Sequence, residues 1–387
     1  MKRILFIVNN FKTGGIQKSL VELLQLISDR YDVSVYASDF TGQFTNQVPE
    51  NIKVIPSSRF AKMLEYPRWE YRKVGGLFNY IIKLILGWLT SKVGKKRTAR
   101  FYCRLLGKLP GDYDWAISYS QPIDDHSFHN LENEIALYCT RAKRRATFVH
   151  CDYAEYGGNT DYNHTLYSQF DAIAAVSKSV ANRFVSVLPD LTDKVSVVYN
   201  ACNAKSIQEQ SELNPISYNR TCFVSVCRLS PVKGLFRCVE IFEQLKDEGF
   251  CFEWHIIGGG DNTYLNDMFT SIKICNLENI VFLEGEQINP YRFMKNADYL
   301  FLPSFHEAAP MVFNEAFSLG LRVITTETLS ARELVESRSI GIVCKNDVNS
   351  IYTALKNALR SSNSSYKSDS LDEWNDTVKT QFDALIA

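Results

Sequence analysis

The chain has 387 residues, which is too long for one ordinary hydrophobic core and favours two domains. A hydrophobic content of 45% and a charged content of 22% are typical of a soluble globular protein and exclude a fibrous or disordered one. Residues 1–200 hold 26 Lys and Arg against 19 Asp and Glu, whereas residues 201–387 hold 17 against 24. This asymmetry argues against a nucleic-acid-binding protein and suggests that one half of the chain meets an anionic ligand.

The start of the chain, MKRILFIVNN, is expected to form a core strand, because no signal-peptide cleavage pattern follows its short apolar run. No apolar run reaches the ~20 residues that cross a bilayer. The ten cysteines form no CxxC pair, so we expect buried free thiols in a reducing cytoplasm and no metal site.

Apolar runs rich in Val, Ile, Phe and Tyr recur along the chain, with helical patterns between them. The runs are continuous rather than alternating, which is typical of strands covered on both faces of a parallel sheet. Alternation of strands and helices predicts βαβ units. The expected strands lie at residues 3–9, 32–38, 114–120, 144–150, 171–177, 194–200, 221–227, 252–258, 279–285, 298–304, 322–326 and 341–344.

The strand pattern restarts after a polar stretch, residues 200–220, whose composition suits a linker. We therefore expect an α/β chain of two doubly wound, Rossmann-like domains facing a central cleft. The first is residues 1–200 with a basic and aromatic insertion at 59–108, and the second is residues 201–365. The last segment, 366–387, is expected to return to the first domain. Ligands of such sheets bind outside the carboxyl ends of the strands, so residues just after strands are the candidates.

In the first domain, Gly14 and Gly15 stand between the first strand and a helical repeat of apolar residues that begins at Ile16. Glycine lets the backbone approach a ligand closely, and a helix N-terminus offers free N–H groups to an anion. A plain tight turn explains the two glycines equally well.

In the second domain, Arg228 and Lys233 flank Ser230 and Pro231, which together predict a helix start. Two cations at a helix N-terminus oppose the macrodipole unless an anion binds between them. The pattern favours a phosphate site over two solvated cations. After the next strand, Gly259 opens a loop that is either a close ligand contact or a turn.

The stretch FHEAAPMVFNEAFSLG, residues 305–320, places Glu307 in a loop after a strand and Glu315 about 1.5 turns into the following helix. Carboxylates at such positions accept hydrogen bonds from the hydroxyls of a sugar or ribose. Ala308 and Ala309 add backbone N–H groups in the same loop. The alternative is a capping Glu307 and a salt-bridged Glu315.

Together these motifs resemble the GT-B glycosyltransferases, specifically the retaining glycosyltransferase family 4 (group 1) of polysaccharide assembly. The resemblance covers nearly the whole chain and is most specific in the Glu-x7-Glu motif and the SLGLRVITT that follows it. It implies a hexosyltransferase that uses a nucleotide diphosphate sugar, with UDP favoured, and that requires no other cofactor. By this resemblance Arg228 and Lys233 hold the diphosphate, Glu315 the ribose and Glu307 the transferred sugar.

The resemblance extends to ATFVHCDY, where His150 ends a strand and is similar to a histidine near the family's acceptor. It implies a catalytic-centre role, although a lone histidine at a strand end is more often structural. The family usually has glycine where this chain has Ala308, which affects the expected donor geometry. Asp112-x-Asp114 looks like a metal motif of another fold, but it precedes a strand, so we expect no metal there.

The insertion at residues 59–108 holds 13 Lys and Arg, only two acidic residues, and Trp69 and Trp88. It is too short and too charged to span a bilayer, and it suits a helix lying in the headgroup layer of an anionic membrane. The alternative is an insertion whose apolar face packs on the core. Membrane contact would favour a lipid-linked acceptor and a cytoplasmic enzyme on the inner face of the plasma membrane.

Two other functions stay open at this stage. A GT-B nucleotide-sugar epimerase would use soluble substrates and would give no reason for the insertion. A non-catalytic partner subunit would bind without transfer. Contacts to ribose and diphosphate are common to UDP, GDP and ADP donors, so the sequence leaves the base, the sugar and the acceptor open.

Overall fold

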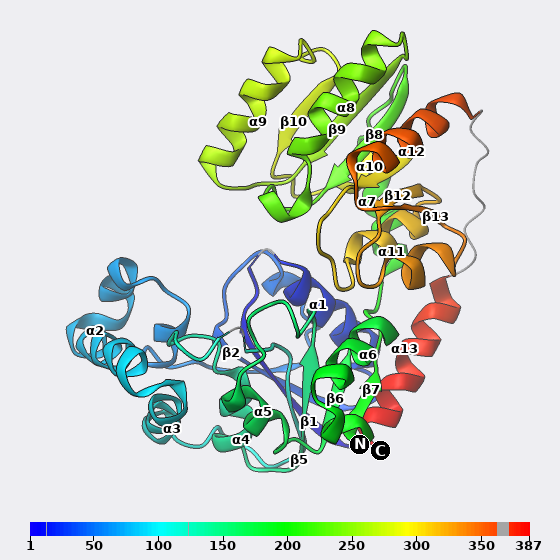
Figure 1. Ribbon diagram of the computed structural model, residues 1–387. Coiled ribbons are helices and arrows are strands. Elements are labelled where there is room, and N and C mark those ends of the chain that lie inside the picture. Colours follow the sequence, from blue (N-terminus) through cyan, green and yellow to red (C-terminus); the bar gives the residue numbers. More distant parts are fainter. Residues whose placement is uncertain (13, 123, 362–370) are drawn as a thin grey trace. The chain divides into compact units, whose positions relative to one another are not determined.

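The computed structural model describes the chain except residues 13, 123 and 362–370. The chain forms two compact units (Figure 1): unit 1 is Met1–Ala201 with Trp374–Ala387, and unit 2 is Cys202–Glu373. Each unit is a parallel sheet with helices on both faces, which confirms the expected doubly wound α/β fold. The expected domain boundary between residues 365 and 366 lies outside the described residues.

The sheet of unit 1 has the order β3-β2-β1-β4-β5-β6-β7, and its strands pair in parallel. Six of these strands match predicted runs, whereas β3 was missed because three residues at a sheet edge give almost no periodic signal. The strands are β1 (Arg3–Asn10), β2 (Asp32–Asp39), β3 (Lys53–Ile55), β4 (Tyr113–Ser118), β5 (Ala142–Val149), β6 (Ala172–Ala175) and β7 (Val195–Val197).

Helices α2, α3 and α4 pack on one face of this sheet, through a core that includes Tyr71, Tyr102 and Ile135. On the other face the ring of Phe382, from α13, stacks on Phe6 at 6.1 Å between centroids. The helices of unit 1 are α1 (Gly15–Ile27), α2 (Arg68–Val93), α3 (Lys95–Leu106), α4 (Glu132–Tyr138), α5 (Asp161–Tyr167), α6 (Lys178–Val187), most of α13 (Leu371–Leu385), and the short η1 (Thr45–Gln47), η2 (Ala61–Leu64) and η3 (Pro189–Lys194).

The sheet of unit 2 has the order β10-β9-β8-β11-β12-β13, again with parallel pairing. All of its strands match predicted runs, and those inside the sheet are mostly buried apolar segments, whereas the edge strands β10 and β13 are partly exposed. They are β8 (Thr221–Val226), β9 (Phe252–Ile257), β10 (Val281–Gly285), β11 (Tyr299–Leu302), β12 (Arg322–Thr326) and β13 (Gly341–Cys344).

Helices α8, α9 and α12 share one core with one face of this sheet, where Phe242 stacks on Trp254 at 4.5 Å between ring centroids. Helices α7, α10 and α11 pack together beside the other face. The helices of unit 2 are α7 (Ala204–Ser211), η4 (Pro231–Lys233), α8 (Phe236–Asp247), α9 (Asn262–Ile274), α10 (Tyr291–Met294), α11 (Met311–Ser318), η5 (Arg332–Glu336) and α12 (Val348–Arg360).

Two local expectations were wrong. The polar stretch taken as a linker contains α7, which begins where the Asn203 side chain accepts a hydrogen bond from Ser206 N–H. The helix expected from Ser230 begins only at Phe236, after the 3₁₀ turn η4. Gly234 ends that turn at φ 65°, and a Cβ there would lie 2.1 Å from the Pro303 carbonyl oxygen, so this close approach requires glycine.

Candidate functional site

The predicted donor-site residues of unit 2 gather at the carboxyl edge of its sheet. Arg228 follows β8, Gly259 follows β9, and Glu307 lies in the loop after β11. Glu315 follows on α11. Because parallel strands end at one edge of a sheet, three different loops contribute to this edge.

Lys233 and Glu307 form an ion pair across this edge. The Lys233 Nζ lies 2.5 Å from Glu307 Oε1, and the Ser304 hydroxyl donates to the same oxygen at 2.7 Å. The Glu307 side chain is only 10% exposed and that of Lys233 is 21% exposed. Charged groups that are this poorly hydrated attract each other more strongly than an exposed pair does. The structure thus brings one cation and one carboxylate of the prediction into contact.

Backbone and side-chain contacts hold these two loops together. The Phe305 N–H donates to the Val232 carbonyl at 2.8 Å. Arg237 donates to the Pro303 carbonyl at 2.7 Å and to the Asn346 side chain at 2.6 Å. The same guanidinium lies 3.9 Å from the centre of the Phe305 ring. Ser304, Arg237 and Asn346 were not predicted, although Ser304 ends one predicted strand and Asn346 lies shortly after another.

Arg228 is exposed, and no side-chain partner is recorded for it among the described residues. Its neighbour Leu229 pairs with the Gly259–Gly260 loop, through a 2.8 Å hydrogen bond from Leu229 N–H to the Gly259 carbonyl. A Cβ on Gly260 would lie 2.2 Å from the Leu229 carbonyl oxygen. Close backbone packing therefore explains Gly260. A Cβ on Gly259 would approach only side-chain atoms of Glu286.

Glu315 is buried in the middle of α11, with 5% of its surface exposed. Pro310 precedes the helix with an extended backbone, so the helix starts at Met311 and not at the proline as predicted. Gly320 follows with φ 67°, as expected for a helix C-terminus. Ala308 and Ala309 are half-buried in the loop between Glu307 and this helix.

In unit 1, His150 follows β5 at the carboxyl edge of the sheet. Its backbone N–H donates to Gln121 Oε1, and its ring packs on Tyr119 at 4.8 Å between centroids. The imidazole Nε2 is shielded from solvent and has no hydrogen-bond partner within the part of the chain that the structure describes. Burial lowers the pKa of His150 to about 3, so the ring is neutral at physiological pH.

Gly14 and Gly15 lie at the start of α1, at the same edge of the sheet of unit 1. Gly14 is the N-cap residue and no side chain caps the helix. The first turn carries no acidic residue, so its dipole is not compensated there by a side-chain charge. Ser19, further along α1, shares a 3.1 Å hydrogen bond with the Tyr119 hydroxyl beside His150.

Several buried ionisable side chains in unit 1 were not predicted. Glu132 and Glu134, at the start of α4, are almost fully buried, as is Lys95, which donates to backbone carbonyls. Burial and then the nearby Glu65 raise the pKa of Glu132 to about 8. Burial also raises the pKa of Glu134, whose Oε1 accepts a hydrogen bond from Tyr162 at 3.0 Å. In the sequence these glutamates look like ordinary first-turn acids.

Asp112 and Asp114 have cationic partners in unit 1. Asp112 pairs with Arg141 at 2.9 Å, and Asp114 pairs with Lys143 at 2.8 Å. The Lys143 ammonium and the Arg3 N–H lower the pKa of Asp114. The ion pairs account for both carboxylates of this motif.

Helices α2 and α3 carry an exposed apolar surface, which we name the α2–α3 face. Phe78 is 76% exposed and Trp88 is 60% exposed. Tyr71 and Leu86, on the opposite side of α2, are buried in the core of unit 1. The α2–α3 face comprises Trp69, Leu77, Phe78, Ile81, Ile85, Trp88, Val93, Phe101 and Leu105.

By length and composition, α2 is long and apolar enough to cross a bilayer, so the expectation that this segment is too short was wrong. Among the helices of the described residues, α2 is the only one with this length and composition. Gly76 interrupts it with non-helical angles, φ 76° and ψ 166°. Lys83, within it, donates to the Met63 and Tyr66 carbonyls of unit 1. These contacts attach one side of α2 to the rest of unit 1.

Residues 206–370 match the family described as Glycosyl transferases group 1. The chain is 36% identical over 128 residues to the amylovoran biosynthesis glycosyltransferase AmsK of Erwinia amylovora, covering 30% of each chain. It is 26% identical over 196 residues to the N-acetylgalactosamine-N,N'-diacetylbacillosaminyl-diphospho-undecaprenol 4-alpha-N-acetylgalactosaminyltransferase of Campylobacter jejuni, covering 50% of this chain and 52% of that one. The chain thus spans from 30% to about half of the length of these two relatives.

Solved structures match over the whole chain. Anabaena HepE, solved in complex with UDP, superimposes with a TM-score of 0.63 at 17% identity, covering 100% of this chain and 94% of that one. Staphylococcus aureus TarM, solved with UDP and sugar ligands, gives a TM-score of 0.67 at 10% identity over 100% of both chains. At such low identity the likeness shows the fold alone. The chain has the GT-B fold, and residues 206–370 match the Glycosyl transferases group 1 family within unit 2.

Proposed function

We propose that this chain is a glycosyltransferase that moves a sugar from a nucleotide diphosphate sugar, UDP favoured, to a lipid-linked glycan acceptor. The reaction would serve the assembly of a bacterial surface polysaccharide. The observation that carries the proposal is the Lys233–Glu307 pair beside the exposed Arg228, at the carboxyl edge of the sheet of unit 2. This edge offers positive charge for a diphosphate and a carboxylate for hydroxyl groups.

The two members of the ion pair keep hydrogen-bonding capacity for a ligand. An ammonium has three donors, and a carboxylate has two acceptor oxygens. Lys233 uses one donor on Glu307 Oε1, which also accepts from Ser304. The remaining Lys233 donors and the Arg228 guanidinium would bind the diphosphate, and Glu307 Oε2 would accept from the transferred sugar. Glu315 would bind the ribose, with Gly259, Ala308 and Ala309 lining the loops.

The bond changes follow from this assignment. The bond from the anomeric carbon to the phosphate oxygen breaks, and a bond to the acceptor oxygen forms. Arg228 and Lys233 stabilise the negative charge that develops on the leaving phosphate. We favour attack from the same face, in which the leaving phosphate oxygen takes the proton of the acceptor hydroxyl and the anomeric configuration is retained. Glu307 Oε1 already accepts two hydrogen bonds, which makes it a poor nucleophile.

In unit 1, His150 and the Gly14–Gly15 loop are proposed to take part in substrate binding. A neutral His150 with an unpartnered Nε2 can hold a hydroxyl group by a hydrogen bond but cannot supply positive charge. The uncapped N-terminus of α1 can bind a phosphate oxygen through its free N–H groups.

The α2–α3 face is proposed to bind an anionic phospholipid bilayer. Its exposed aromatic and aliphatic side chains would enter the interface, and Lys96, Arg97, Arg100 and Arg104 on α3 would approach the headgroups. An enzyme bound in this way would act at the cytoplasmic face of the plasma membrane. The Campylobacter jejuni relative supports a lipid-linked acceptor, because its name specifies a diphospho-undecaprenol carrier.

A thermal-shift panel of nucleoside diphosphates and their sugars tests the donor. A ligand at ~100 times its dissociation constant adds about 2.7 kcal/mol to the unfolding free energy, so UDP should raise the melting temperature. Glu315→Ala should remove most of that shift. Glu307→Gln should keep the shift with UDP and lose sugar transfer. If no nucleotide in the panel shifts the melting temperature, the donor proposal is wrong.

Two further measurements test the finer assignments. NMR of the product reports the anomeric configuration, and an inverted product would rule out same-face attack. Co-sedimentation with anionic vesicles tests the membrane contact, which should weaken with salt and in Phe78→Ser. Phe269→Ser, which changes another exposed phenylalanine, on α9 of unit 2, is the control and should bind as the native chain does.

A further inference from the structure

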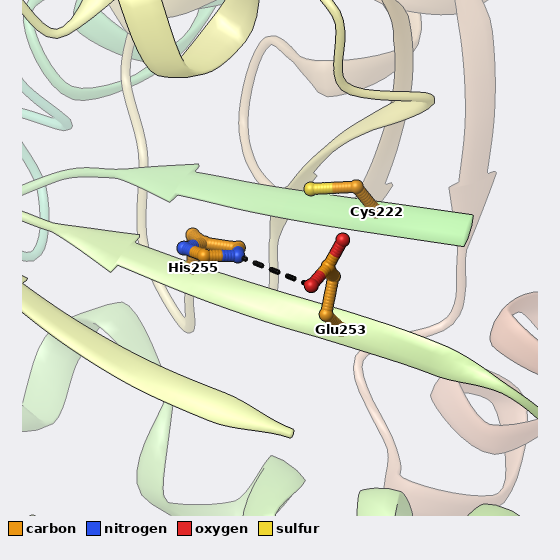
Figure 2. Close-up of side chains that lie close together, drawn as sticks. All are labelled: Cys222, Glu253 and His255. Carbon is orange, nitrogen blue, oxygen red and sulfur yellow. Dashed lines mark ion pairs between the residues drawn. The ribbon is translucent and has the colours of Figure 1, made fainter. Parts of the chain in front are cut away.

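A cysteine, a glutamate and a histidine converge on one face of the sheet of unit 2. Cys222 on β8 lies opposite Glu253 on β9 in the strand register, and His255 lies two residues further along β9. Side chains two residues apart in a strand share a face, so the three lie on the same face. This face is opposite the one where Trp254 packs on α8. Figure 2 shows the three side chains gathered over the neighbouring strands.

The ligating atoms of these side chains are close together and shielded. One atom from each residue lies within 4.8 Å of the other two, and His255 Nε2 is 3.8 Å from Glu253 Oε2. Cys222 is fully buried, and His255 is 8% exposed. Among the described residues, His255 Nε2 and Glu253 Oε1 are buried without a hydrogen-bond partner. Buried polar atoms normally have partners, so this arrangement calls for a bound group.

Glu284 on β10 orients the histidine for ligation. His255 Nδ1 lies 2.7 Å from Glu284 Oε1. When Nδ1–H donates to that carboxylate, the lone pair of Nε2 faces the cluster. A carboxylate that holds the second nitrogen is the usual support of a metal-bound histidine.

Aromatic rings enclose the cluster. Phe282 stacks on His255 at 4.7 Å between ring centroids, and the Tyr218 ring lies at 5.0 Å. The Tyr218 hydroxyl donates to the Phe293 carbonyl at 2.8 Å, which anchors it beside α10. Asp298 accepts the Cys222 N–H at 2.8 Å. These rings and hydrogen bonds shield the three candidate ligands from solvent.

We propose that Cys222, Glu253 and His255 bind a zinc ion that links β8 to β9. Thiolate, imidazole and carboxylate are all zinc ligands, and bond lengths of 2.0–2.3 Å place ligand atoms roughly 3.3–3.8 Å apart in a tetrahedron. The His255–Glu253 separation already matches, so only small side-chain rotations are needed for the third ligand. One thiolate and one carboxylate neutralise Zn²⁺ in the buried site.

Binding is coupled to loss of the thiol proton. Burial, followed by the Glu253 and Asp298 carboxylates, raises the pKa of Cys222, so without a cation the thiol stays protonated. Zinc binding releases that proton to solvent and forms the Zn–S bond. Cys222 and Glu253 are the second residues of β8 and β9, and His255 lies within β9, while the candidate donor site lies beyond the carboxyl ends of the strands. The ion is thus structural and independent of the proposed transfer reaction.

Metal analysis of the full chain, purified without a histidine tag, tests this site. After dialysis we expect about one zinc per chain by mass spectrometry, and more than a tenfold loss in Cys222→Ser and in His255→Gln. Cys275→Ser, a buried cysteine of unit 2 outside the cluster, is the matched control and should keep its zinc. Native zinc content in Cys222→Ser would overturn the proposal.

Binding of Co²⁺ to the native chain tests the proposed zinc site even if a variant does not fold. In the native chain, Co²⁺ should give a thiolate-to-cobalt charge-transfer band, and one equivalent of zinc should abolish it. Zinc should also raise the melting temperature of the native chain while leaving that of Glu253→Gln nearly unchanged. A native chain that shows neither the band nor a melting shift contradicts the site.

Discussion

Ionisable side chains at the carboxyl edges of the two sheets differ in their exposure and in their charge state. In unit 2, Lys233 and Glu307 remain partly exposed and paired, and Arg228 is exposed. In unit 1, Glu132 and His150 are withdrawn from solvent, and burial holds both in their neutral forms at neutral pH or close to it. The same doubly wound architecture therefore carries one charged edge and one largely neutral edge.

This difference indicates what each edge can bind. A pair of accessible cations suits a diphosphate, whose charge must be met by fixed positive groups. A neutral imidazole and protonated carboxyls suit hydroxyl groups, because a neutral partner exchanges hydrogen bonds without leaving a buried charge. We therefore propose that the charged edge of unit 2 binds the diphosphate and that His150 in unit 1 holds an acceptor hydroxyl.

The largest expected effect is at the charged edge. Lys233→Ala should lower kcat/KM for the donor by about 10²–10³, because one fixed donor to the developing negative charge is lost. Steady-state kinetics with a UDP-sugar measures this. Lys273→Ala, at an exposed lysine of α9, is the control and should leave kcat/KM unchanged. Equal losses in both variants would mean that general surface charge, rather than this edge, binds the donor.

A second expected effect concerns the neutral edge and pH. The pKa of Glu132 rises from 4.5 to about 8 on folding, so between these values the unfolded chain loses a proton that the native chain keeps. The unfolding free energy should therefore fall as pH rises from 5 to 8, by up to a few kcal/mol. Glu132→Gln should flatten this dependence in urea titrations at the two pH values. The exposed Glu50→Gln is the control, and an equal slope in all three chains would contradict a buried neutral Glu132.

The smallest expected effect tests the neutral histidine. His150→Asn should lower kcat about tenfold, the equivalent of one hydrogen bond of ~1.4 kcal/mol, and should keep the UDP-induced melting shift. Because the pKa of His150 is about 3 in the folded chain, the native pH–rate profile should show no His150 titration near pH 6.5. The exposed His126→Asn serves as control. If the native pH–rate profile has a titration step near pH 6.5 that is absent from the profile of His150→Asn, then the His150 ring is charged during turnover.

The stability contribution of His150 has the opposite sign to that of Glu132. Its folded pKa lies below its unfolded value of 6.5, so the native chain resists protonation that the unfolded chain accepts. The contribution is complete above pH 6.5 and is lost as pH falls toward about 3.

Much of the fold was readable from the sequence because it depends on local patterns. Runs such as YLFL and VSVYA are rich in apolar and β-branched residues and are buried in their sheets. The exceptions depend on contacts that the pattern does not contain. The start of α8 is set by the approach of Gly234 to Pro303, about 70 residues away in the chain. Helix α7 was not predicted, because most of its residues are polar and give no apolar repeat.

The candidate site was readable only in part for the same reason. Arg228, Lys233 and Glu307 could be selected because they lie in the connections that follow strands, and Glu315 because of its spacing from Glu307. The contact of Lys233 with Glu307 depends on the Phe305–Val232 backbone hydrogen bond, which no local pattern predicts. The neutral state of His150 depends on the shielding of its ring, and the grouping of Cys222 with His255 depends on the register of β8 against β9.

The path of the chain also has a consequence for how the protein is made. Lys2 Nζ and Trp115 Nε1 both donate to the carbonyl of Ile386, so the last turn of the chain completes the sheet domain that the first residues began. A ribosome must therefore synthesise all of unit 2 before unit 1 can close. Until then the side of β1 that Phe382 covers in the folded chain lacks this contact.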